Sequence, residues 1–206
     1  TTARLVPWAN EVTGQIIHDC FTKDGKPHPF SSRNVLKRVL ALYKKEGLTP
    51  VIAPEMEFYL VEKNSNRGLP LKPPIGRSGR PETARQSYSI DAANEFEPFV
   101  ELMYNYCEAM ELDIDTLIHE SGAAQLEVNF IHGDPLDLAD QVFTFKRTVR
   151  EAALKNDIYA TFMAKPMAEE PGSATHIHQS LLSSSTGDNV FATKDGEYSE
   201  TFYHYM

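Results

Sequence analysis

Residues 117–130 show the period of two that is typical of β-strands, and the alternation of polar and apolar side chains is clean from residue 125 onward. Small residues around Gly122 divide the segment into two short strand-like pieces. From Gln125 onward, Gln125, Glu127 and Asn129 lie on one face and apolar residues lie on the other. Glu120 lies across the glycine bend and can face the same cavity as Glu127. The segment therefore predicts a sheet with one packed face and one polar face that carries carboxylates.

Two other segments show the same alternation. In residues 51–60 the apolar positions alternate with Glu55 and Glu57, and in residues 174–181 one face carries His176, His178 and Ser180. Three strands with such faces predict one sheet lined by four carboxylates and two imidazoles.

Four carboxylates held close together repel one another, and burying them unpaired is prohibitive, so they are either protonated or surround cations. A donor set rich in oxygen, with one or two imidazoles, favours Mg²⁺ or Mn²⁺ over Zn²⁺. Clustered divalent ions are typical of proteins that neutralise a triphosphate and transfer its terminal phosphoryl group. A glutamate on a strand is usually just part of a solvated face. The conjunction of all three segments favours the metal-site interpretation.

Composition excludes several other classes of protein. The chain has 206 residues, a formal net charge of −9 and no basic face, which argues against a nucleic-acid partner. It has no apolar run of about 20 residues, so no membrane span is predicted. The two cysteines, Cys20 and Cys107, are far apart in the sequence, which fits a reducing cytosol and predicts a cytoplasmic protein. No P-loop motif and no Gly-x-Gly-x-x-Gly is present.

The remaining pattern predicts an α+β fold with a mostly antiparallel, curved sheet that is backed by helices, rather than a Rossmann sheet. Beyond the three segments above, we expect strands at residues 3–8, 11–20 and 159–162, helices at about 32–46, 89–110 and 135–156, and a turn at 187–189 that joins hairpin strands. Residues 64–88 form a loop too long to be an idle connection. Three of its arginines, at positions 77, 80 and 85, either bind phosphate or, as we prefer, are solvated or contact another subunit.

The ends of the sequence predict a piece of a longer protein. The chain starts without Met, and it stops at Met206 within what reads as the first turns of a helix.

Several motifs together resemble the glutamine synthetase family over nearly the whole chain. They are Ala53-Pro54-Glu55-Met56-Glu57-Phe58, His119-Glu120, Gln125-Leu126-Glu127, and Lys165-Pro166 followed by Gly172-Ser173-Ala174-Thr175-His176-Ile177-His178-Gln179-Ser180. The last of these is highly specific. Within the family, residues 76–83 and 170–174 most resemble the γ-glutamylpolyamine (γ-glutamylputrescine) synthetase branch.

The resemblance implies a catalytic domain from residue 28 to residue 206, preceded in residues 1–27 by the tail of a small β-grasp N-terminal domain. It implies that one divalent ion is held by Glu57, Glu120 and Glu127, and a second by Glu55 and His176. His178 and Ser180 would approach ATP, with Asp115 near the ribose, and Gly172 would belong to the loop that receives L-glutamate. Family members assemble as dodecamers with active sites between subunits, so a homo-oligomer is expected.

The reaction that the resemblance implies is phosphoryl transfer from ATP to the γ-carboxylate of glutamate, followed by attack of an amine or ammonia on the γ-glutamyl phosphate. Two departures from ammonia-using members, Pro171 and Ala174, favour an amine larger than ammonia, because proline removes an amide donor and stiffens the loop. The alternatives are a true glutamine synthetase, a catalytically silent structural or regulatory member, and a metal-dependent kinase that performs no ligation. Several expected ligands would lie outside the 206 residues, so this piece alone is predicted to be inactive.

Overall fold

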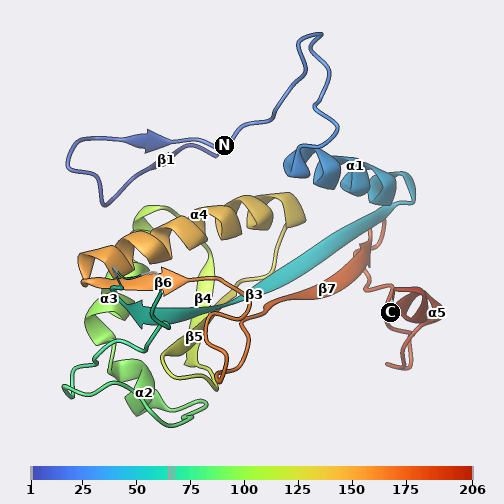
Figure 1. Cartoon of the computed structure of the whole chain (residues 1–206). Helices are drawn as coiled ribbons and strands as arrows, with labels where there is room; N and C mark the ends of the chain where they lie inside the picture. Colours follow the sequence, from blue (N-terminus) through green and yellow to red (C-terminus); the bar gives the residue numbers. More distant parts are fainter. Residues whose placement is uncertain (1, 65, 67, 206) are drawn as a thin grey trace.

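A computed structural model describes residues 2–64, 66 and 68–205 (Figure 1). Its centre is one long strand, β3 (Leu48–Glu62), which is paired along both edges. One edge pairs with β5 (Gln125–Phe130), which in turn pairs with β4 (Ile114–His119). The other edge pairs first with β7 (Thr175–Ser183) and then with β6 (Ile158–Thr161). All these pairings are antiparallel, which confirms the α+β prediction.

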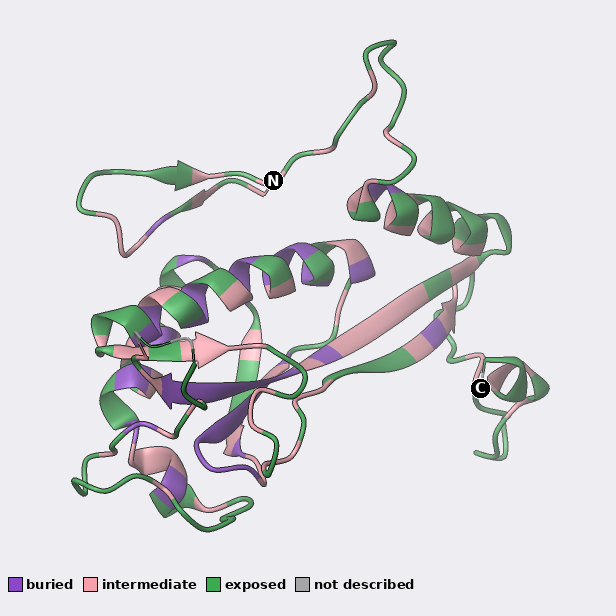
Figure 2. Cartoon of the chain, viewed as in Figure 1, coloured by how far each residue is buried: buried purple, intermediate pink, exposed green. Residues whose placement is uncertain are grey.

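Two helices cover one face of this sheet and form the core with it. They are α3 (Glu97–Ala109) and α4 (Pro135–Lys155), and their buried side chains pack against Met56, Phe58 and Leu60 of β3. Asp134 begins α4 as the sequence predicts, because its carboxylate accepts hydrogen bonds from the backbone of Leu136 and Asp137. Figure 2 shows that burial is concentrated in the second half of β3, in β5 and on the inner side of α4.

The single helix predicted over 89–110 is wrong, because the structure has two. Ser89 caps α2 (Ile90–Asn94), and α3 starts only at Glu97. Pro98 explains the break: within a continuous helix its ring would clash with the carbonyl of Asn94, and it has no N–H to donate. The predicted apolar stripe of α3 nevertheless lies in the core.

The N-terminal part packs less closely than the sequence suggests. The strands predicted at 3–8 and 11–20 shrink to β1 (Arg4–Leu5) and β2 (Gly14–Gln15), which within the described ranges pair only with each other. Helix α1 (Ser32–Lys45) ends near Gly47 as expected, yet its apolar residues Val35 and Val39 are exposed.

The C-terminal part is also looser than predicted. The turn at 187–189 leads to a single bridge between Leu182 and Asn189 rather than to a second hairpin strand, and the chain then forms the short helix α5 (Glu200–His204). Across the described ranges, no helix has the length and apolarity needed to cross a bilayer.

Candidate metal centre

The register of β3 determines which side chains share the sheet face opposite the helices. Glu55 lies between Asn129 of β5 and His176 of β7, and Glu57 lies directly opposite Glu127. Cross-strand partners project from the same face of a sheet. The pairing of three strands therefore gathers acidic and imidazole side chains that are far apart in sequence, with a separation of 123 residues between Glu55 and His178.

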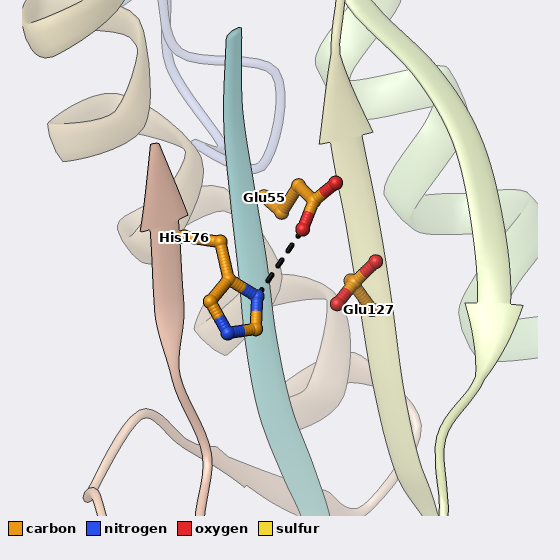
Figure 3. A group of neighbouring side chains, drawn as sticks. All are labelled: Glu55, Glu127 and His176. Carbon is orange, nitrogen blue, oxygen red and sulfur yellow. Dashed lines mark hydrogen bonds and ion pairs between the residues drawn. The ribbon is translucent and has the colours of Figure 1, made fainter. Parts of the chain in front are cut away.

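These side chains converge on one point. Ligand atoms of Glu55, Glu127 and His176 all lie within 4.8 Å of one another, and Figure 3 shows them pointing together from three strands. The Nδ1 atom of His176 is 3.2 Å from Glu55 Oε2 and 3.7 Å from Glu57 Oε1. His178 Nε2 is 2.7 Å from Glu55 Oε1, so the carboxylate of Glu55 lies between two imidazoles.

The centre holds negative charge that the described residues do not neutralise with lysine or arginine. Glu57 and Glu127 are 8% and 6% exposed, and no ion pair in the described ranges joins a Lys or Arg to these two residues, to Glu55 or to Glu120. Burial raises the pKa of Glu127, and repulsion from Glu55, Glu120 and Glu57 raises it further. Carboxylate oxygens and imidazole nitrogens are suitable ligands for Mg²⁺ or Mn²⁺. The residues present therefore fit a bound divalent ion.

Hydrogen bonds hold one side of the Glu57 carboxylate in place. Its Oε2 atom accepts from Gln125 Nε2 at 2.9 Å and from the backbone N–H of Ala174 at 3.0 Å. The Oε1 atom remains on the side of His176. Gln125 also donates to the carbonyl of Gly172 at 3.0 Å and accepts from the N–H of Gly122 at 2.9 Å. The sequence places Gln125 on the correct face but does not predict that it holds Glu57 in position. An amide side chain close to acidic residues on a buried strand is a signal from which this role could have been inferred.

The segment that contains Gly172 is tied to the sheet by its backbone. The hydroxyl of Tyr59 donates to the carbonyl of Pro171 at 2.7 Å, and Glu57 N donates to Ala174 O at 3.2 Å. Burial raises the pKa of Tyr59, and the nearby charges of Glu170 and Glu57 raise it further. The phenol therefore stays protonated and can donate its hydrogen bond. A Cβ atom on Gly172 would lie 2.9 Å from the carbonyl oxygen of Ala164, so a larger residue would displace the loop.

Glu120 and Ser180 lie at the edges of this cluster of carboxylates and imidazoles. Glu120 follows β4 and is half-buried, and its charge contributes to the raised pKa of Glu127. Ser180 lies on β7 opposite Val51, two residues beyond His178 on the same face. The four carboxylates and both histidines thus surround one region, with Ser180 at its end.

Asp115 lies elsewhere on the sheet. It is exposed on β4, and the described part of the chain records no contact between it and the carboxylates. Burial raises the pKa of Tyr104 on α3, with smaller contributions from Cys107 and Asp115, which places Asp115 near that helix.

Comparisons with known proteins show which family the chain belongs to. The family model described as "Glutamine synthetase, catalytic domain" matches residues 29–206. The γ-glutamylputrescine synthetase PuuA of Escherichia coli K12 is 35% identical over 190 residues, which cover 91% of this chain and 40% of that protein. A glutamine synthetase of Mycolicibacterium smegmatis is 33% identical over 200 residues, covering 95% of this chain and 42% of the relative.

A solved structure described as a GmaS/ADP complex superposes with a TM-score of 0.82 at 29% identity, over 98% of this chain and 45% of that one. The chain thus spans less than half the length of the relatives it matches. Because the family model covers most of its residues, the chain belongs to the glutamine synthetase family.

Proposed function

We propose that this chain carries the metal and nucleotide site of an ATP-dependent ligase that joins L-glutamate to an amine. The observation that supports it most is the convergence of Glu55, Glu127 and His176, from three separate strands, within 4.8 Å. Buried like charges destabilise a sheet unless a cation or a proton compensates them, so such a cluster is suited to binding.

In this proposal Glu57, Glu120 and Glu127 hold one divalent ion and Glu55 with His176 holds another. Glu127 lies between the two groups, since it opposes Glu57 and also lies within reach of Glu55 and His176. His178 and Ser180 continue along β7 and would contact the nucleotide. Asp115 would approach the ribose. Among the described residues it makes no contact with the carboxylate cluster, and its exposed position on β4 is open to a ligand.

The bound ions would neutralise the phosphates of ATP and the charge that develops on the transferred phosphoryl group. The protein's own contribution is orientation. The segment with Gly172, held by Tyr59 and Gln125, presents a fixed backbone beside Glu57, where glutamate would bind. Phosphorylation of the γ-carboxylate gives a γ-glutamyl phosphate with a good leaving group, and a fixed geometry lets an amine react before water does.

The acceptor we favour is an amine larger than ammonia, such as a polyamine. Pro171 has no N–H, so its backbone offers no hydrogen-bond donor to the attacking amine, and its carbonyl accepts a hydrogen bond from Tyr59. The similarity to γ-glutamylputrescine synthetase supports the same choice. Ammonia remains the alternative, because glutamine synthetases match the chain almost equally well. We further propose that the whole protein works in the cytosol as a homo-oligomer.

An amine panel tests the proposal. The purified whole protein, rather than these 206 residues alone, is given ATP, glutamate and Mg²⁺ with putrescine, spermidine, methylamine or ammonia, and ADP release and the γ-glutamyl product are measured. Amine-dependent ADP with a polyamine product is expected. Activity with ammonia alone would identify a true glutamine synthetase. ADP without any amine would indicate a kinase, and no ADP with any amine would identify a silent family member.

A further inference from the structure

A buried carboxylate outside the metal cluster ties the long 64–88 loop to the bend that carries Glu120. Only 5% of the Glu82 side chain is exposed. Its Oε2 atom accepts a hydrogen bond from the backbone N–H of Ala124 at 2.7 Å and lies 2.9 Å from Nε2 of His119. Its Oε1 atom is buried and has no hydrogen-bond partner among the described residues.

These contacts span the two ends of one bend. His119 is the last residue of β4, and Ala124 immediately precedes β5, so Glu82 bridges the strands on either side of Glu120. The ring of His119 is itself fully buried, and its Nδ1 atom is 2.7 Å from the carbonyl oxygen of Glu120. Glu82 therefore contacts the ring of His119, and this ring contacts the backbone of Glu120, a candidate metal ligand.

The bend needs such support. Ala124 has φ +57, a left-handed conformation that is unfavourable for a residue with a Cβ atom, and its N–H has Glu82 as acceptor. A neutral side chain could anchor the loop without leaving a buried carboxylate oxygen unpaired. Hydrogen bonds from groups outside the coordination sphere commonly orient metal ligands, and Glu82 with His119 is placed to act in this way on Glu120.

We propose that Glu82 is a positioning residue: through His119 it fixes the backbone of Glu120, so that the Glu120 carboxylate faces Glu127 across the metal centre. This inference rests on the proposed function, in which Glu120 is a metal ligand. Glu82 itself touches neither metal nor substrate.

The test is Mn²⁺ binding, measured by electron paramagnetic resonance on the purified wild-type protein and on Glu82→Gln, with the thermal midpoint recorded for each. Glutamine keeps the size of the side chain and an acceptor for Ala124, but not the charge. We expect a Mn²⁺ affinity about tenfold weaker, the lower end of what outer-shell changes cause. The matched control is Glu95→Gln, since Glu95 accepts from Ser78 N in the same loop and is not part of the metal centre. The control should bind Mn²⁺ as the wild type does.

A double-mutant cycle shows whether the effect passes through Glu120. In a Glu120→Gln background, Glu82→Gln should weaken Mn²⁺ binding no further. Unchanged affinity in the single variant, or a full additional loss in the double variant, would overturn the inference. If Glu82→Gln does not fold, Glu82→Asp replaces it, and failure of both to fold would mean that Glu82 serves folding rather than positioning. Because Mn²⁺ binding needs no turnover, a wild type that binds the ion but joins no amine refutes the proposed function alone.

Discussion

Glu57 of β3 and Glu127 of β5 are direct cross-strand partners, and both are buried. Like charges in directly opposed positions destabilise a sheet, and burial strengthens their repulsion. Hydrogen bonds from Gln125 and Asn129 compensate part of this charge. The pair therefore lowers the stability of the metal-free protein and favours any cation that enters.

Removing one of these charges should stabilise the metal-free protein. Glu127→Gln keeps the shape of the side chain and an oxygen for Asn129, so in EDTA at neutral pH we expect the free energy of unfolding to rise by up to about 1 kcal/mol. Urea denaturation measures it. The control is Glu62→Gln, on β3 opposite Ile158 of β6, and it should have little effect. A clear loss of stability in Glu127→Gln would contradict the electrostatic account.

The same residue should make stability depend on pH in a defined direction. The pKa of Glu127 is raised from 4.5, chiefly by burial, so the folded state binds this proton more tightly than the unfolded state. The contribution of Glu127 to the free energy of unfolding should therefore fall as pH rises from about 4.5 through the raised pKa. In EDTA, the stability difference between wild type and Glu127→Gln should be small below this range and reach a plateau above it. A stability difference between the two proteins that does not change with pH would refute the raised pKa of Glu127.

Much of the site follows from the sequence, because a strand has a period of two. Alternation alone places Glu55 and Glu57 on one face of their strand. It likewise places His176 and His178 on one face of theirs. It could not supply the register, which depends on how β3 divides its two edges among three further strands. The cross-strand pairing of Glu57 with Glu127, and the position of Glu55 between two imidazoles, are consequences of that register.

Other features depend on contacts that have no local signature. The role of Gln125 requires knowing that the segment around Gly172 folds back onto the sheet. The apolar residues keep helical spacing across the break before Pro98. The sequence pattern alone therefore predicts one helix where the structure has α2 and α3. For α1, the apolar stripe indicated burial, but the described residues leave Val35 and Val39 exposed.

Gly122 should be intolerant of any side chain. A Cβ atom there would lie 1.9 Å from the hydroxyl oxygen of Tyr59, whose ring is fully buried and whose O–H supports Pro171. Gly122→Ala should therefore destabilise the fold by about 1–3 kcal/mol, as overpacking in a core does. Thermal unfolding checks this against Gly14→Ala, which has nothing within 4 Å of the new methyl group. Equal stability of the two variants would show that the Tyr59 contact is dispensable.

Gln125 should matter both to metal binding and to the segment with Gly172, where we propose that glutamate binds. Gln125→Leu leaves Glu57 Oε2, the carbonyl of Gly172 and the N–H of Gly122 each without one hydrogen bond. We expect a loss of about 1–3 kcal/mol in stability, weaker Mn²⁺ binding and, in an active preparation, a higher KM for glutamate. The matched control is Gln179→Leu, an exposed glutamine on β7. Unaltered Mn²⁺ affinity and glutamate KM in Gln125→Leu would mean that this network is only structural.

Binding of Mn²⁺ to the purified protein, titrated by isothermal calorimetry, tests the central claim most directly. The account predicts that the wild type binds the ion and that Glu127→Gln and His176→Ala each weaken binding by at least about tenfold, because a lost ligand costs no less than a lost outer-shell contact. Both variants should retain the wild-type circular dichroism spectrum. Wild-type Mn²⁺ affinity in both folded variants, or a wild type that binds no Mn²⁺, would contradict it.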